Sequence, residues 1–114
     1  MEPCNTTRSR SLGASVLAAA GPVARMRRLL GTKGLAAGAG LWIRPCRAIH
    51  SIGMKHDFDV LFLDAAGAVV GAYRGFPRRR VSRIFRSADG VLELPAGTID
   101  ATGTQIGDMI AFRE

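Results

Sequence analysis

The sequence has few of the residues that cross-link or break a chain. Its 114 residues include two cysteines and five prolines beside 14 glycines. Cys4 and Cys46 cannot form a framework of several disulfides, and they fall short of the four closely spaced thiols of an all-cysteine zinc site. The composition therefore excludes a disulfide-rich scaffold and that class of structural zinc domain, and it is neither collagen-like nor that of a disordered chain.

Long apolar runs are also missing. The longest stretch without a charged residue is Ser11–Ala24, which contains two glycines and a proline. A helix needs about 20 mostly apolar residues to cross a bilayer, so we expect no transmembrane segment. Hydrophobic residues still make up 47% of the chain. A chain of this length and composition is expected to form one domain around a single modest core.

Acidic residues are scarce, and their distribution is uneven. Nine Asp and Glu stand against 16 Lys and Arg, which gives a net charge of +7. Residues 1–57 contain nine basic and two acidic residues, whereas residues 58–114 contain seven of each. Within the second half, one stretch has basic residues and no acid: Arg74, Arg78, Arg79, Arg80, Arg83 and Arg86.

This arginine-rich stretch has two interpretations. The guanidinium group binds phosphate and carboxylate through two hydrogen bonds, so Arg78, Arg79, Arg80 and Arg83 are candidate anion-binding residues. Arg74–Arg86 could then bind nucleic acid or another anionic surface weakly. Alternatively, the stretch is a solvated face that the acidic C-terminal strands partly neutralise. No recognised nucleic-acid module accompanies it, so we expect no specific nucleic acid as partner.

The N-terminal segment also has two interpretations. Two arginines precede the apolar stretch Leu12–Ala20, a pattern typical of a weak secretory signal, which would make the protein secreted or periplasmic. In the other interpretation Ser15–Ala19 is a strand and Pro22–Leu30 is an amphipathic helix that begins with proline and stops at Gly31. We favour the second interpretation, and with it a cytoplasmic protein. Residues 1–12 are then a disordered tail, and residues 13–114 form a single domain.

Most of the remaining sequence predicts short strands separated by turns. Asp57–Asp64 reads DFDVLFLD and is apolar on both faces, as in a central, covered strand, and Gly67 supplies the turn of a following hairpin. Thr98 and Gly103 bound a single helical turn. The other expected strands are Leu41–Ile43, Ala68–Tyr73, Val81–Phe85, Val91–Leu94 and Met109–Phe112. We therefore predict a small α+β domain, mostly β, with one N-terminal helix and about six short strands in a compact mixed or antiparallel sheet or partial barrel.

Several of these segments together resemble a known family. The runs GLWIRPCRAIHSIGMKHDFDVLFLDAAGAVV and VLELPAGTIDATGTQIGDMIAF are similar to the domain of unknown function 192 family, also called uncharacterised protein family 0127. The residues that carry the resemblance are Pro45, Cys46, Ile49, His50, Met54, Asp59, Val60, Phe62, Leu63, Asp64, Leu92, Glu93, Gly97, Gly107 and Asp108. The resemblance implies a compact, mostly β fold and no established activity. The chain departs from the family pattern at Arg28 and at His56–Asp59.

The residues that could carry chemistry lie between Cys46 and Asp64. Candidate ligand-binding residues are Cys46, His50, Met54 and Asp59, with Asp59 orienting the imidazole of His50 at one end of the sheet. A thiolate, the imidazoles of His50 and His56 and a carboxylate could hold zinc, but their spacing is not a recurrent one. Cys46 and His50 could form a nucleophile and base, although no oxyanion donor can be named. We therefore predict no catalytic residue, no metal site and no cofactor.

The most favoured function is a non-enzymatic domain that binds a protein or small-molecule ligand, or an accessory piece of a larger assembly. Two alternatives stay open. One is a metal-binding protein or thiol-dependent enzyme that uses Cys46, His50 and Asp59. The other is the weak binding of nucleic acid or an anionic surface through Arg74–Arg86.

Overall fold

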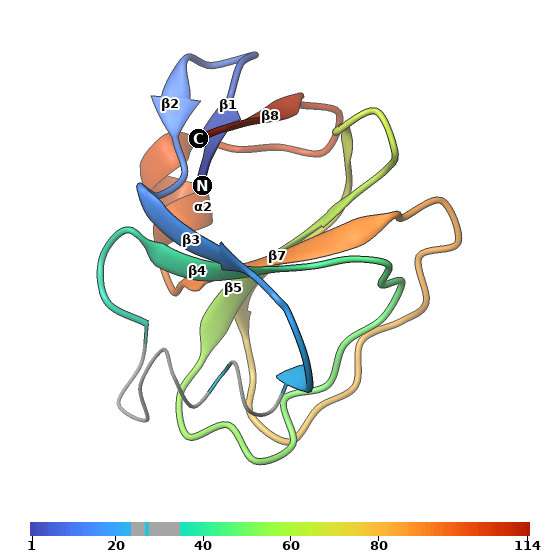
Figure 1. The fold of residues 1–114 in the computed structure, drawn as a ribbon. Coiled ribbons are helices and arrows are strands. Elements are labelled where there is room, and N and C mark those ends of the chain that lie inside the picture. The colour runs from blue at the N-terminus through green and yellow to red at the C-terminus, as the bar shows by residue number, and fades with distance from the viewer. Residues whose placement is uncertain (24–26, 28–34) are drawn as a thin grey trace.

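A computed structural model of the chain describes residues 1–23, 27 and 35–114. The described residues form two sheets and a short helix, α2 (Figure 1). The smaller sheet has the order β2-β1-β8, and the larger one has the order β3-β4-β7-β5-β6. Strands β3 and β4 are parallel, and every other described pair is antiparallel. The elements are β1 Glu2–Asn5, β2 Arg10–Ser11, β3 Ser15–Ala18, β4 Ala39–Ile43, β5 Phe58–Leu63, β6 Val69–Phe76, β7 Gly90–Pro95, α2 Thr98–Thr102 and β8 Ile110–Arg113.

Strand β5 lies between β7 and β6, and all six of its residues are buried. Side chains alternate across a strand, so its residues divide between two hydrophobic clusters. Leu61 and Leu63 pack in one cluster with Leu94 and Ile99 of β7 and α2. We call this side of the larger sheet the helix face. The prediction that Asp57–Asp64 forms a central, covered strand is confirmed.

The opposite side of the sheet is covered by loops. Phe58, Val60 and Phe62 pack there with Ile49, from the loop after β4, and Ala88, from the loop before β7. We call this side the loop face. In Figure 1 these loops occupy the lower end of the molecule, and the smaller sheet occupies the upper end.

The first residues of the chain correct one expectation. The sequence suggested that residues 1–12 are a disordered tail, but β1 pairs along its whole length with β8, and β2 pairs with β1. Cys4 and Leu12 are buried, and Leu12 joins the cluster on the helix face. The partner strand lies about a hundred residues away in sequence, and a local pattern does not reveal such a pairing.

Two further expectations differ from the structure. The N-terminal helix expected at Pro22–Leu30 is not confirmed, because most of it lies outside the described residues and the helix that the structure describes, α2, is near the C-terminus. Val81–Phe85 is not a strand, because only Val81 makes a β-bridge, to His50. The broader prediction of a small β-rich domain is confirmed, and the described residues form two sheets and no closed barrel.

No helix in the described part of the chain is long and apolar enough to span a bilayer.

Candidate functional site

Asp59 has a structural role in β5. Its side chain is buried on the helix face, where Oδ1 accepts a hydrogen bond from the Gly75 backbone N–H at 2.8 Å. Oδ2 accepts another from the Ile99 N–H, also at 2.8 Å. One carboxylate thus ties the central strand to β6 and to α2. Both of its oxygens are engaged by backbone donors.

His50 lies on the other side of the sheet. It is exposed in the loop after β4, it bridges Val81, and its Nδ1 accepts the Ile52 N–H at 3.3 Å. The neighbouring Ile49 packs on the loop face with Val60, whereas Asp59 points to the helix face. The prediction that Asp59 orients His50 is therefore wrong, because consecutive residues of β5 point to opposite faces.

Cys46 and Met54 lie at the edge of the cluster on the loop face. The Cys46 thiol is half-buried and donates a hydrogen bond to the Ala48 carbonyl at 3.0 Å. Burial raises the pKa of this thiol, and the nearby carboxylate of Glu93 raises it further, while the hydrogen bond to Ala48 and the charge of Arg27 act in the opposite direction. A raised pKa leaves less thiolate, so the thiol is not activated as a nucleophile.

The proposed metal ligands do not come together. No three His, Cys, Asp or Glu side chains within the described ranges converge closely enough to hold an ion. Both ring nitrogens of His56 are shielded from solvent, and neither has a hydrogen-bond partner among the described residues. Cys46 and Asp57 make contacts of their own, to Ala48 and to Arg78 at 4.0 Å. The donor set of a zinc site is therefore dispersed.

The other two buried carboxylates also accept hydrogen bonds from other parts of the chain. Glu93 lies on the loop face of β7 and forms two hydrogen bonds with Arg27, from Nε to Oε1 at 3.0 Å and from Nη2 to Oε2 at 2.5 Å. Asp108 binds Arg8 and the side-chain amide of Asn5, and together they hold the pKa of the Asp108 carboxyl at about 2. Each buried acid thus fastens separate segments of the chain together.

Residues 77–86, which contain every arginine of the arginine-rich stretch except Arg74, follow β6 directly and are held against the loop that carries His50. We call residues 46–55 and 77–86 the paired loops. Ser51 is buried between them: its Oγ donates to the Pro77 carbonyl at 2.5 Å and accepts from the Arg80 N–H at 2.9 Å. Two backbone bonds continue the contact, from Ser51 to Arg80 at 2.9 Å and from Ser82 to Ile49 at 2.8 Å. The sequence did not predict this pairing. It brings the candidate residues Cys46, His50 and Met54, but not Asp59, to the same end of the molecule as the candidate arginines.

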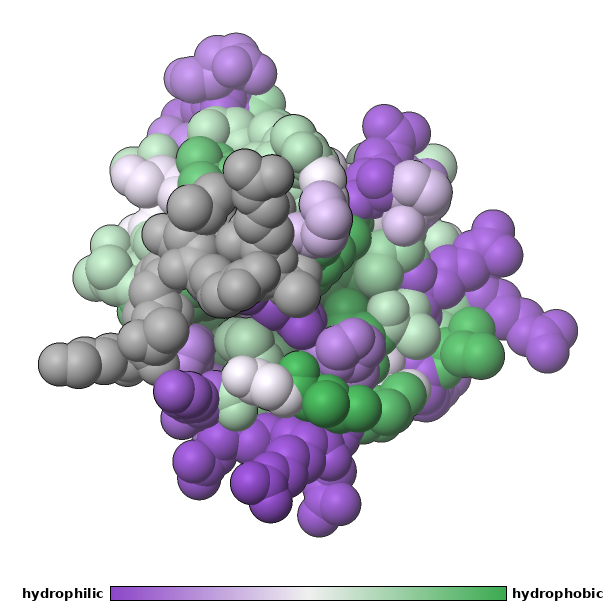
Figure 2. Space-filling view, turned by 60° about the horizontal axis from the view of Figure 1, so that its bottom comes forward, coloured by the Kyte–Doolittle hydropathy of each residue, from purple (hydrophilic) through white to green (hydrophobic). Residues whose placement is uncertain are grey.

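Apolar side chains project from the paired loops among the arginines. Ile52, Val81 and Ile84 are 63%, 69% and 65% exposed. A pocket beside them is lined by Met54, Lys55, Arg78 and Arg79. In Figure 2 the lower end of Figure 1 comes forward, and hydrophobic residues there lie among strongly hydrophilic ones. The run RRRVSRIFR indicates such a mixed surface, since Val81 and Ile84 interrupt the charge, whereas the sequence pattern predicts a strand at Val81–Phe85.

In the part of the chain that the structure describes, the arginines of this surface are mostly free of acids. Arg78 has only the distant contact with Asp57, and Arg83 lies over the Phe85 ring at 4.6 Å from its centroid. Arg79 has a positive φ of 60°, a conformation that a bulky residue rarely adopts. Arg74, the first arginine of the stretch, lies elsewhere and pairs with Asp100 at 2.8 Å. Arg78, Arg79, Arg80 and Arg83 are thus grouped on the paired loops, and Arg74 is not.

Two solved structures share the fold. One is described as a "putative transcription regulator" from Sinorhizobium meliloti 1021; it is 20% identical, covers 96% of this chain and 89% of its own, and has a TM-score of 0.70. The other is a protein of unknown function from Novosphingobium aromaticivorans DSM 12444, which is 14% identical, covers 97% and 82%, and has a TM-score of 0.76. At these identities the likeness concerns the fold alone.

The remaining comparisons concern the sequence. No curated protein matches the chain. The sequence model of the DUF192 family, described as "Uncharacterized ACR, COG1430", matches residues 4–112. This match covers almost the whole chain and reaches into strands β1 and β8, which pair in the smaller sheet. The chain therefore belongs to the DUF192 family.

Proposed function

We propose that this chain is a non-enzymatic binding domain that recognises an acidic segment of a partner protein through the paired loops. The observation that carries the proposal is the exposed surface of these loops, where Ile52, Val81 and Ile84 stand among arginines whose one acidic contact within the described residues is that of Arg78 with Asp57 at 4.0 Å. Exposed apolar side chains that are grouped and rimmed by polar residues mark interaction sites, and arginine is enriched in protein interfaces.

Two properties of the site support binding rather than catalysis. The hydrogen bonds of Ser51 and Ser82 hold both loops in one conformation, so little entropy is lost when a partner docks. The buried acids Asp59, Glu93 and Asp108 already hold backbone or side-chain donors. A general acid or base needs a carboxyl that can exchange its proton with a substrate, and these three serve the fold instead.

A protein partner is favoured over nucleic acid because of the apolar content of the surface. Binding to a phosphate backbone needs mainly charge, and exposed isoleucine and valine add little to it. An acidic segment with interspersed apolar side chains matches both components. The net charge of +7 would also steer such a segment toward the domain.

The proposal can be tested with a fluorescent peptide of alternating Glu and Val and, in parallel, a random DNA duplex. We expect the peptide to bind more tightly than the duplex at physiological salt. Replacing Arg79 and Arg80 with Asn should weaken peptide binding about tenfold, or ~1.4 kcal/mol. Asn is chosen because it tolerates the positive φ of residue 79.

The matched control removes two charges from the opposite end of the molecule. Arg10→Asn with Arg113→Asn changes the net charge equally, in β2 and β8. Binding that weakens equally in both double variants would reflect overall charge and would contradict a site on the paired loops. Tighter binding of the duplex than of the peptide would contradict the choice of partner.

A further inference from the structure

The outer edge of β6 carries a row of backbone groups. Strand β6 ends the five-stranded sheet, next to β5. The Leu63 carbonyl of β5 accepts the Asp89 N–H on the β7 side at 2.7 Å, so Leu63 and, two residues before it, Leu61 direct their backbone groups toward β7. Their partners on β6 are Val69 and Ala72. These two residues therefore direct their own N–H and C=O away from β5.

Part of this edge is already covered. At Val69 the N–H donates to the Asp108 carbonyl at 2.9 Å, and the carbonyl accepts the Gly107 N–H at 2.8 Å. Beyond Val69 the edge opens, since neither Ala72 nor Arg74, which follows at the period of two, has a backbone partner outside the sheet in the part of the chain described. An unpaired strand edge is a template for another strand.

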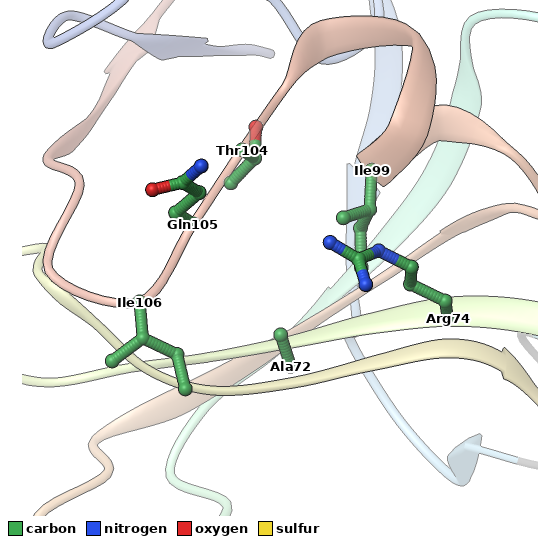
Figure 3. A pocket seen from close by; sticks show the side chains of 6 residues that line it. All are labelled: Ala72, Arg74, Ile99, Thr104, Gln105 and Ile106. Carbon is green, nitrogen blue, oxygen red and sulfur yellow. The ribbon is translucent and has the colours of Figure 1, made fainter.

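A pocket lies where the covering segment leaves β6. It is lined by Ala72, Arg74, Ile99, Thr104, Gln105 and Ile106. Figure 3 shows Ala72 on the strand between Ile106 on one side and the guanidinium of Arg74 on the other. The segment Gln105–Gly107 thus diverges from β6 beyond Val69. The edge of β6 at Ala72 and Arg74 is left free there by the described residues.

We propose that an extended acidic segment of a partner binds as an added strand along Ala72–Arg74, with a carboxylate facing Arg74 and an apolar side chain on Ile106. This proposal rests on the proposed function and gives the binding mode of the same partner. Arg74 and Asp100 are 64% and 72% exposed, and an ion pair so open to solvent is exchanged for another carboxylate at little cost. Ile106 is 66% exposed and offers the apolar contact.

The alternation of side chains connects this edge with the paired loops. Every second side chain of the added strand would face the pocket, and the ones between would face the loop face. There the Arg83 N–H donates to the Tyr73 hydroxyl at 3.3 Å, and Phe85 lies against Gly71. The basic loop therefore borders β6 on the loop face, and one extended segment can reach both surfaces. Main-chain bonds would supply affinity and alternate side chains specificity.

The first experiment measures amide hydrogen exchange by NMR with and without a peptide of repeated Glu-Glu-Val-Val, because each face of such an extended strand alternates acidic and apolar side chains and can meet both Arg74 and Ile106. We expect exchange at the Ala72 and Arg74 amides to slow in the complex. Copies of the peptide methylated on alternate backbone nitrogens form two sets, which differ by a shift of one residue, and we expect the two sets to differ in affinity. One set loses affinity about tenfold because its methyl groups replace donors to β6, and the set shifted by one residue keeps its affinity.

A protein variant complements the peptide series. Ala72→Pro removes an outward N–H that the β5–β6 ladder does not use, and proline is accepted on edge strands. We expect Ala72→Pro to abolish the part of the peptide affinity that comes from pairing with β6. Ala72→Ser, which keeps the N–H, should bind the peptide as the parent protein does. The methylated peptides provide the answer even if the proline variant fails to fold.

The outcomes separate the two proposals. Peptide binding with unchanged exchange at Ala72 and Arg74, and with equal effects of both methylation sets, would overturn the added strand and leave binding at the paired loops. Absence of any peptide binding would overturn both. Slower exchange at the two amides in concentrated protein without peptide would show that a second copy of the chain occupies the edge, and it would overturn the choice of occupant.

Discussion

Single carboxylates illustrate how this sequence uses its few acidic residues. Asp59, Glu93 and Asp108 all belong to the family-like pattern and are all buried. Each receives hydrogen bonds from distant parts of the chain, from α2, from Arg27 and from Arg8. Removing one partner from such a contact leaves a buried group without compensation, which costs more than the contact contributes. At the scale of residues, these acids maintain the architecture.

Asp108 should make the stability of the domain depend on pH. Its pKa in the folded protein is about 2, below the ordinary 3.8, chiefly because Arg8 and then Asn5 bind the carboxylate. The contribution is therefore complete above pH 3.8 and is lost as the pH falls toward 2. Asp108→Asn should reduce the free energy of unfolding at neutral pH by about 1–3 kcal/mol and flatten this acid dependence.

The measurement is urea unfolding at several pH values. Asp100→Asn serves as the control, since Asp100 is exposed and its pair with Arg74 should contribute little. Equal losses of unfolding free energy in the two variants would show that the contacts of Asp108 stabilise the fold no more than an exposed ion pair does.

Phe62 tests the placement of the core. It is fully buried on the loop face and stacks on Phe85, with 4.2 Å between ring centroids. Phe62→Ala should cost about 3–5 kcal/mol, a large part of the stability of a domain of this size. Phe112→Ala is the comparison, because Phe112 is partly exposed and should cost less. A loss below about 1 kcal/mol for Phe62→Ala in thermal or urea unfolding would contradict the assigned core.

At the scale of elements, the sequence predicted those strands and turns that a local pattern of residues specifies. The run from Asp57 to Asp64 contains the buried strand β5, Gly67 has a φ of 95° in its hairpin, and the helical turn from Thr98 ends at Gly103. Period-two patterns and glycine turns are local, so they can be identified in one sequence. The pairing of β1 with β8 and the contact between the paired loops depend on residues far apart in sequence, and no local pattern contains them.

The expected contact between His50 and Asp59 is not formed, for a related reason. Asp59 begins the central strand, and the tight path permitted by Ser51 and Gly53 predicted that the imidazole of His50 would reach the same rim of the sheet. The loop that carries His50 instead returns over the face of Val60 and Phe62, while Asp59 points to α2. Strand alternation shows that Asp59 and Val60 diverge, but it does not show which face the loop covers.

The paired loops should depend on Ser51. Its hydroxyl bonds both Pro77 and Arg80 in a buried position, so Ser51→Ala should leave the Arg80 N–H without its side-chain partner. We expect a loss of about 1–3 kcal/mol and faster hydrogen exchange at Arg80 and Ser82 than in the core strands. Thr102→Ala is a suitable control, since its hydroxyl bonds also lie in a short local element, α2. Unchanged exchange in the loops would show that Ser51 does not hold them.

At the scale of the whole molecule, charge and shape divide the protein into two ends. The smaller sheet and its acidic contacts lie at one end, and the paired loops with their arginines lie at the other (Figure 1). Family membership and fold are compatible with many functions, so the proposed function depends on this surface. Binding of the acidic peptide should weaken as salt rises, because exposed charges are screened beyond about 8–10 Å. An affinity that is independent of salt would contradict an electrostatic contribution.

The most direct test of the central claim is a chemical-shift map of the isotope-labelled protein titrated with the peptide of alternating Glu and Val. The account predicts the largest changes at the amides of Ile52–Lys55 and Arg78–Ile84, with β2 and β8 almost unchanged. Changes concentrated on β2 and β8, or none at peptide concentrations well above that of the protein, would contradict a binding surface on the paired loops.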